Sequence, residues 1–292
     1  MILKSKIKAY AKLNLFLDIT GKRADNYHDI LTAMCLVDLA DDITVTVEEG
    51  TGVSITCSDS GIPKGGENSA YKAAVLFAER IKADKRIDID IIKKIPVMAG
   101  LGGSSADAAA VLRGLNTLMG GPLSLGELLE TGAATGSDVP FCIRGGMALC
   151  AGTGTEITAD LPVPDCVFLI IKPEFSCSTK EAYGLYGANP LPVSGETELF
   201  LKAAKRGDYS CFAKHMYNAF EILYANPEIE RLKNELTSAG ARGACLTGSG
   251  SAVFGVFDNA EQAGNALNKL DYKIKFIARP VKKEALTAIT GL

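Results

Sequence analysis

A glycine-rich loop at residues 96–106 contains the residue types of this chain that most directly suggest chemistry. Three glycines and two serines lie between a β-prone run at 87–95 and an Ala-rich segment with helical spacing at 105–118. Glycines let the backbone approach a ligand closely, and the start of a helix offers unpaired N–H groups with a partial positive charge. The spacing therefore predicts an anion site, most simply a cradle for phosphate.

Two familiar phosphate loops do not fit this spacing. A Walker A loop needs Gly-Lys before Ser or Thr, a combination that the chain lacks. The dinucleotide fingerprint begins at Gly100 and Gly102, but its third glycine position is Ser105, and a turn with another helix follows where a second strand is required. A strand-to-helix turn without any ligand remains an alternative.

A phosphate cradle without the Walker lysine still needs a cation and a group that activates the nucleophile. Lys12 lies in the strand-like run KAYAKLNLFL, where Tyr10, Lys12 and Asn14 would share one polar face. Asp138, in TGSDVPFCIRGG, is a candidate half-buried general base. A solvated lysine on a strand, and an aspartate that caps a helix or sits in a turn, are the alternatives.

Two further segments attract attention. Tyr27 and His28 stand in the polar loop GKRADNYHD, where an aromatic–imidazole pair could grip a planar ring or simply belong to a surface loop. The second histidine, His215, is expected inside a helix. The triplet at 248–250, Gly-Ser-Gly, is more typical of a hairpin turn than of a second phosphate site.

The elements that must position these residues form an α+β pattern with a largely antiparallel sheet. Alternating and β-branched runs predict the strands, and apolar residues at helical spacing predict the helices. We expect strands at 7–19, 43–49, 87–95, 146–152 and 166–173, two strands within 244–257, and a last strand at 274–281. We expect helices at 69–81, 105–118, 179–186, 196–206, 209–223, 226–240 and 259–270.

Composition narrows the class of protein. The 292 residues suit two ordinary domains, and 47% hydrophobic with 22% charged residues is typical of a globular protein. A net charge of −3 argues against a general nucleic-acid binder, and no apolar run is long enough for a signal peptide or a membrane span. Eight cysteines without a C-x-x-C pair disfavour zinc and redox motifs, so a reducing cytoplasm is expected.

Taken together, several segments resemble the GHMP kinases, named for galactokinase, homoserine kinase, mevalonate kinase and phosphomevalonate kinase. PVMAGLGGSSADAAAVLRGLN resembles their phosphate loop, and AKLNLFLDITGKRADNYHD (11–29) resembles the opening signature of the members that act in non-mevalonate isoprenoid synthesis. GSDVPFCIRGGMALCAGTG (136–154), FSCSTKEAY (175–183) and GARGACLTGSGSAVFGVF resemble a catalytic segment, a substrate-side loop and a last glycine motif. The matches run in the same order along almost the whole chain.

The resemblance implies a two-domain GHMP kinase fold. Residues 1–158 would form a ribosomal-S5-domain-2-like α/β domain, and residues 159–292 a ferredoxin-like α+β domain. The implied activity is ATP-dependent phosphorylation of the 2-hydroxyl of a cytidine diphosphate derivative of methylerythritol, with Mg²⁺ as cofactor. The implied partner is this small molecule, not nucleic acid or a membrane, and monomer and homodimer both remain open.

Residue roles follow from the resemblance position by position. Asp138 would be the general base, and Lys12 would keep it ionised beside the attacking hydroxyl. The acceptor would contact Lys12, Asn14 and Asp138, while Tyr27, His28 and Tyr183 hold its cytosine. Ser105 would lie near phosphate or Mg²⁺. ATP would be bound by Asn68, Lys93, Pro96, Val97, Met98, Ala99, Gly100, Leu101, Gly102, Gly103, Ser104, Ser105 and Ala106.

Two positions depart from the family pattern. Ser104 replaces a glycine of the phosphate loop, and Ser251 replaces a proline after the last glycine motif. Neither departure touches the implied catalytic residues. Another GHMP kinase, of the homoserine or mevalonate type, and a non-catalytic ligand-binding relative are the alternatives, although the latter would be expected to lack Asp138.

Overall fold

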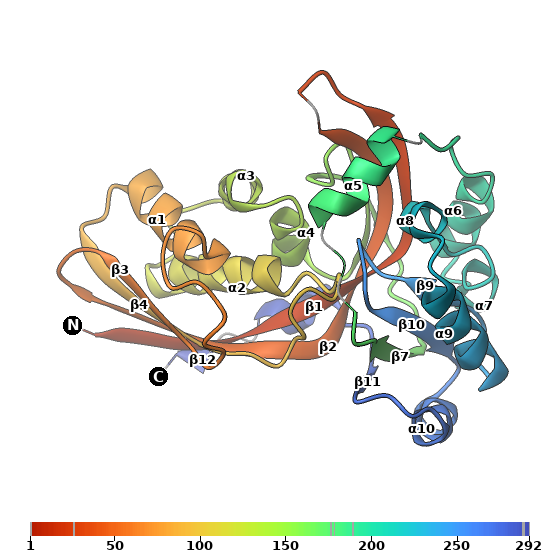
Figure 1. Cartoon of the computed structure of the whole chain (residues 1–292). Helices are drawn as coiled ribbons and strands as arrows, with labels where there is room; N and C mark the ends of the chain where they lie inside the picture. The colour runs from red at the N-terminus through yellow and green to blue at the C-terminus, as the bar shows by residue number, and fades with distance from the viewer. Residues whose placement is uncertain are drawn as a thin grey trace.

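The computed structural model describes residues 2–25, 27–175, 177, 179–188, 190–287 and 290–291. Within this part of the chain the strands form an eight-stranded and a four-stranded sheet. Figure 1 shows the first sheet with its helices on the left and the second sheet with its helices on the right. The mixed α+β character predicted from the sequence is confirmed.

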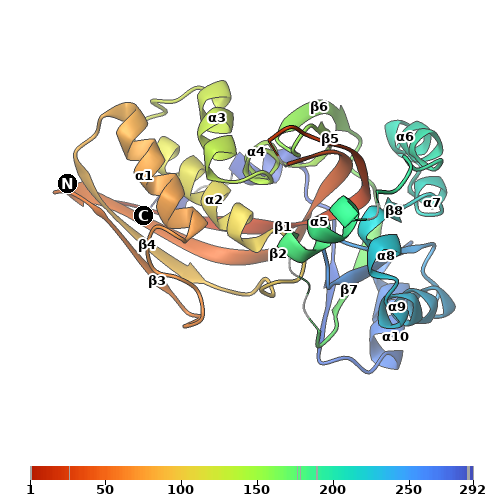
Figure 2. The same ribbon diagram turned by 45° about the horizontal axis from the view of Figure 1, so that its top comes forward.

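A long antiparallel hairpin builds the first sheet and extends into the second half of the molecule (Figures 1 and 2). Its two strands are far longer than the predicted runs, and register shifts near Lys12 and Asn14 bend them. Strands 53–57 and 156–161 had no predicted counterpart. The strands of this sheet are β1 Leu3–Lys22, β2 His28–Glu49, β3 Val53–Cys57, β4 Lys85–Ile92, β5 Met147–Ala151, β6 Glu156–Leu161, β8 Tyr217–Asn218 and β12 Thr290–Gly291.

Four helices gather on one side of this sheet (Figures 1 and 2). The small side chains of the second helix permit close packing: a Cβ at Gly114 would meet Ile7 Cδ1 at 2.5 Å. A capping box at Ser124 and Glu127 starts the third helix. The four helices are α1 Ser69–Ile81, α2 Gly103–Leu118, α3 Leu125–Thr135 and α4 Val139–Arg144.

The central strands of the second sheet are buried on both faces. Along β7 the residues alternate between two cores: Phe168 and Ile170 join the core shared with the first sheet, while Leu169 and Ile171 face a second core. Residues 167–171 of this strand are therefore all apolar. The remaining elements are β7 Val167–Lys172, β9 Ala244–Leu246, β10 Val253–Phe257, β11 Ile274–Ala278, α5 Thr179–Ala188, α6 Thr197–Lys205, α7 Tyr209–Phe212, α8 Ala219–Tyr224, α9 Pro227–Ser238, α10 Ala260–Lys269 and the 3₁₀ helix η1 Lys283–Thr287.

The end of the chain returns to the first sheet. Val281 N donates a hydrogen bond to Leu36 O at 2.8 Å, and β12 pairs with β1 at Ser5 and Lys6. Both termini consequently lie at the same end of the molecule in Figure 1. The eight-stranded sheet therefore contains residues from both ends of the sequence.

The prediction of a single helix at 209–223 is wrong. Helix α7 ends at Phe212, and Tyr217 and Asn218 form the short strand β8, which pairs with Phe16 and Leu17 of β1. The Asn218 side chain then accepts a hydrogen bond from Phe220 N and begins α8. His215 consequently lies between elements, where its Nδ1 is 2.6 Å from Glu196 Oε2.

Across the residues that the structure describes, no helix is long and apolar enough to cross a membrane.

Candidate active site

A cavity of about 620 Å³ lies where β1, the glycine-rich loop, the start of α4 and the β9–β10 loop meet. Most of the predicted site residues line it, although they come from segments more than 100 residues apart. Ala106, Tyr27 and His28 do not, and Ala106 is buried in the core behind the loop. The predicted residues that line the cavity are Lys12, Asn14, Asn68, Lys93, Pro96, Val97, Met98, Ala99, Gly100, Leu101, Gly102, Gly103, Ser104, Ser105, Asp138 and Tyr183.

The glycine-rich loop has the backbone of an anion site. Gly100 and Gly102 have φ values of 74° and 68°, in the left-handed region that favours glycine. Gly102 is the N-cap of α2 and provides no side-chain cap, so the first N–H groups of α2 are open to a ligand. Ser104 lies in the first turn of that helix without a positive φ, so replacing glycine there adds no backbone strain.

Lys12 and Asp138 meet on one wall of the cavity. Lys12 Nζ lies 3.2 Å from Asp138 Oδ2, and the Lys12 side chain is only 5% exposed against 29% for Asp138. A Cβ on Gly102 would lie 2.8 Å from Lys12 Cγ, and one on Gly248 would lie 3.3 Å from its Nζ. The lysine thus passes between two glycine loops, while the carboxylate remains accessible from the cavity.

Asn14 is buried beside Lys12 and holds its ammonium. Lys12 Nζ donates to Asn14 Oδ1 at 2.5 Å, and Asn14 Nδ2 donates to Thr32 Oγ1 at 2.8 Å. Both ends of the side-chain amide are therefore used within the protein. Lys12 and Asn14 share a face, as predicted, and this face borders the cavity although both side chains are almost fully buried.

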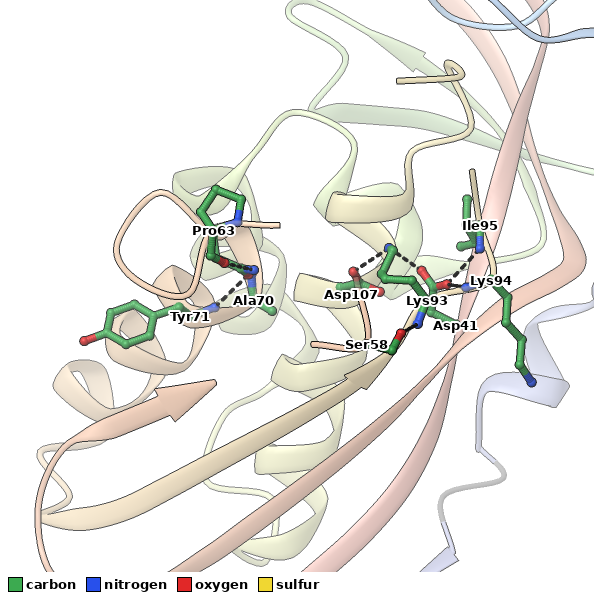
Figure 3. A network of polar contacts seen from close by, with 10 residues as sticks. Asp41, Ser58, Pro63, Ala70, Tyr71, Lys93, Lys94, Ile95 and Asp107 are labelled. Atoms are coloured by element: carbon green, nitrogen blue, oxygen red, sulfur yellow. Dashed lines mark hydrogen bonds and ion pairs between the residues drawn. The ribbon is translucent and has the colours of Figure 1, made fainter. Parts of the chain in front are cut away.

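Lys93 does not present a free charge to the cavity. Its ammonium forms ion pairs with Asp41 and, at 2.9 Å, with Asp107 of α2 (Figure 3). Burial lowers the pKa of Lys93, but the two carboxylates outweigh it and the net pKa is raised. Burial raises the pKa of Asp107 to about 7, and neighbouring Asp41 adds to the effect against the opposing influence of Lys93. Asp107 Oδ1 has no hydrogen-bond partner among the described residues.

Asn68 has a structural task at the cavity edge. Its Oδ1 accepts hydrogen bonds from Ala70 N and Tyr71 N, which caps α1, and its Nδ2 donates to Pro63 O at 2.8 Å. The amide therefore shapes the loop around Pro63, which also lines the cavity.

Tyr183 lines the cavity, and other aromatic rings pack around it. The ring of His28 stacks on Tyr183 with centroids 5.1 Å apart and an interplanar angle of 17°. Burial, with a smaller effect of Lys22, lowers the pKa of His28, which favours the neutral ring. His28 Nε2 is buried without a partner among the described residues, whereas Tyr27, which precedes it in the sequence, is 64% exposed. Residues 176 and 178 of the expected substrate-side loop lie outside the described residues.

The β9–β10 loop joins the same cavity, which its hairpin-like sequence did not predict. Gly248, Ser249 and Gly250 line the cavity, and Ala252 N donates to Ala99 O at 3.1 Å. Asn218 Nδ2 fixes this loop by donating to Gly248 O at 2.8 Å. The hairpin itself is present, so the loop is both a turn and a cavity wall.

Among the described residues, no three His, Cys, Asp or Glu side chains cluster in a way that could hold a metal ion. Ser105, at the start of α2, and Asp138, before α4, bring oxygen-bearing side chains to the cavity wall. This sparse set suits Mg²⁺, which needs few protein ligands when phosphates supply the others.

Comparisons with known proteins agree along the chain. The family model described as GHMP kinases N terminal domain matches residues 68–146, and GHMP kinases C terminal matches residues 200–275. A curated 4-diphosphocytidyl-2-C-methyl-D-erythritol kinase from Caldicellulosiruptor saccharolyticus is 42% identical over 93% of this chain and 94% of its own. The kinase of the same name from Clostridium kluyveri is 39% identical over 94% and 99%.

Solved structures give the same picture. A crystal structure of 4-(cytidine 5'-diphospho)-2C-methyl-D-erythritol kinase superposes with a TM-score of 0.77 at 29% identity, covering 95% of this chain and 99% of its own. Homoserine kinase from Cytophaga hutchinsonii reaches 0.79 at 20% identity, covering 99% and 97%. The second similarity concerns the fold alone, so sequence rather than shape separates the two.

Proposed function

The chain belongs to the GHMP kinase family, and we propose that it transfers the γ-phosphoryl group of ATP to the 2-hydroxyl of 4-diphosphocytidyl-2-C-methyl-D-erythritol. The predicted two-domain α+β fold and the predicted activity class, an ATP-dependent small-molecule kinase, are confirmed with the family. Relatives at about 40% identity over nearly the full chain support this acceptor. The reaction belongs to non-mevalonate (methylerythritol phosphate) isoprenoid biosynthesis.

The observation that carries the mechanism is the Lys12–Asp138 pair, 3.2 Å apart beside an uncapped helix start. Asp138 takes the proton of the acceptor hydroxyl as its oxygen attacks the γ-phosphorus and ADP leaves. Lys12 steadies the carboxylate and the negative charge that develops on the transferring oxygens. Transfer is direct, without a covalent phospho-enzyme.

The ATP phosphates lie against the backbone N–H groups at residues 100–105. Gly100 and Gly102 allow this approach, and the N-terminus of α2 favours the negative charge. Ser105 and the phosphates would hold Mg²⁺, which supplies charge neutralisation for the transfer. The base and ribose are placed at the Asn68 and Lys93 end of the cavity, where Asn68 shapes the wall rather than offering free donors.

The acceptor's cytosine is held where Tyr183 lines the cavity next to His28. Tyr183 and Tyr27, which is exposed outside the cavity lining, provide faces for stacking, and His28 provides a ring nitrogen without a partner among the described residues for the base edge. Holding this remote group orients the reacting hydroxyl near Asp138. The individual residue roles, Asn14 as an acceptor contact included, stay predictions, as do cytoplasmic location and the absence of nucleic-acid binding; monomer and homodimer both stay open.

A substrate panel tests this function. With Mg-ATP and 4-diphosphocytidyl-2-C-methyl-D-erythritol as the acceptor, we expect ATP to be converted to ADP, with a kcat/KM at least about 100-fold above those for homoserine and mevalonate, because neither carries a cytidine for Tyr27, His28 and Tyr183 to bind. A reaction without acceptor is the control for ATP hydrolysis. ADP release no faster than this control would refute the proposal, and preference for homoserine or mevalonate would assign the chain to another member of the family.

A further inference from the structure

Thr247 is a fully buried residue whose hydroxyl joins three segments next to the site without lining the cavity. It follows β9 directly. Asn14 N, on β1, donates to Thr247 Oγ1 at 3.0 Å. The hydroxyl in turn lies 3.4 Å from Asn14 Oδ1 and 3.3 Å from Gly100 O, two acceptors that share its single proton.

The residue that Thr247 contacts is the one that holds the ammonium of Lys12. Asn14 Oδ1 accepts from Lys12 Nζ at 2.5 Å, and Thr32, whose hydroxyl donates to Phe16 O, anchors the other end of the amide. Thr247 therefore touches both the backbone and the side chain of Asn14. A shift of Asn14 would move the ammonium relative to Asp138.

The third contact of Thr247 reaches the glycine-rich loop. Gly100 O belongs to the segment placed against the ATP phosphates, and the Thr247 backbone lies so close that a Cβ on Gly100 would come within 2.0 Å of Thr247 O. The Thr247 hydroxyl thus connects Asn14, which holds the Lys12 ammonium, with the glycine-rich loop, which binds the ATP phosphates in the proposed function. Lys12 and this loop, which must act on the same phosphoryl group, are fixed relative to each other at Thr247.

We propose that Thr247 is a positioning residue for phosphoryl transfer, which keeps the Lys12–Asn14 pair in register with the glycine-rich loop; this inference rests on the proposed function. A hydroxyl is needed because it must accept from one backbone N–H and donate to an oxygen at the same time. Valine would fill the same space but leave Asn14 N–H buried without a partner. Serine keeps both hydrogen-bonding capacities.

The test compares Thr247→Val, Thr247→Ser and the control Thr131→Val. Thr131 is also buried and its hydroxyl donates to a carbonyl, Glu127 O at 2.8 Å, but it lies in α3 away from the cavity. We expect Thr247→Val to lower kcat by about 10- to 100-fold, since small misplacements of reacting groups are costly, with both KM values within about threefold. Thr247→Ser should keep kcat within about threefold of wild type, and Thr131→Val should leave it unchanged.

Hydrogen exchange of the Asn14 backbone amide provides a readout that does not require the acceptor substrate. We expect faster exchange at Asn14 in Thr247→Val than in wild type or Thr131→Val, because the backbone N–H loses its hydrogen-bond acceptor. A Thr247→Val protein that lowers thermal stability like the control but keeps wild-type kcat and Asn14 exchange overturns the proposal. If wild type itself does not phosphorylate the acceptor, the proposed function fails, and the exchange comparison still supports or overturns the positioning contact.

Discussion

Substituting Gly100 with alanine should damage both folding and activity, because this glycine lies where the two glycine loops touch. A Cβ at Gly100 would lie 2.0 Å from Thr247 O and 3.0 Å from its carbonyl carbon, and φ is +74°. Contacts below 3.0 Å essentially do not occur, so the β9–β10 loop would have to retreat by about 1 Å. Left-handed backbone costs alanine about 1–2 kcal/mol and forced repacking about 1–3 kcal/mol, which together lower the free energy of unfolding by about 2–5 kcal/mol.

Gly120 provides the matched control. Its φ is +80°, but no atom lies within 4 Å of the position that a Cβ would take, so Gly120→Ala should cost only the backbone part, about 1–2 kcal/mol. Urea unfolding measures both free energies, and an ADP-release assay measures kcat. We expect Gly100→Ala to lose about 100-fold or more in kcat while Gly120→Ala stays near wild type. Equal stability and equal kcat in the two variants would refute the inferred contact between the loops.

Three further changes test other parts of the site. Because burial raises the pKa of Asp107 from 3.8 to about 7, the folded protein keeps a proton over a pH range in which the unfolded chain has released it. The free energy of unfolding should therefore fall as the pH rises from about 4 to 7, by at most ~1.4 kcal/mol per pH unit. Urea titrations of Asp107→Asn at several pH values should lack this part of the pH dependence. Lys93→Met leaves Asp41 and Asp107 buried without a cation and should lower the free energy of unfolding by about 3–5 kcal/mol; an unchanged urea midpoint would contradict the ion-pair account. Tyr27→Ala should raise the KM for the acceptor with kcat near wild type, since this exposed side chain does not line the cavity that contains Lys12 and Asp138; an unchanged KM would remove Tyr27 from the cytosine site.

Local sequence patterns predicted the elements whose causes are local. Helix α1 was expected at 69–81 and occupies Ser69–Ile81, because its apolar spacing and the capping side chain of Asn68 both lie within the segment. The glycine-rich loop was placed correctly between a strand and a helix for the same reason. The apolar run of β7 predicted a strand, and its burial on two faces accounts for the lack of alternation.

Contacts between distant segments were beyond this kind of prediction. Lys93 pairs with Asp41, which lies 52 residues earlier, and Thr247 contacts Asn14 across 233 residues. Nothing near Thr247 in the sequence indicates such a partner. The family resemblance implies that Lys93 is a nucleotide-site residue, but it does not indicate that the Lys93 ammonium forms ion pairs with two carboxylates.

The same limit explains the errors in secondary structure. The segment 209–223 has helical composition, but Tyr217 and Asn218 are drawn into pairing with β1 and break the helix. The return of the chain end to β1 also depends on a partner at the opposite terminus. In both cases a tertiary contact overrides local propensity.

The central claim is that Asp138 takes the proton of the acceptor hydroxyl with Lys12 beside it. Turnover of Asp138→Asn with Mg-ATP and 4-diphosphocytidyl-2-C-methyl-D-erythritol measures this directly, with calorimetric binding of each substrate as the check on folding. Asp271→Asn, an exposed aspartate outside the cavity, is the matched control. We predict that Asp138→Asn binds both substrates but loses about 10²–10⁴-fold in kcat while Asp271→Asn does not; a kcat for Asp138→Asn within about threefold of wild type would contradict the claim.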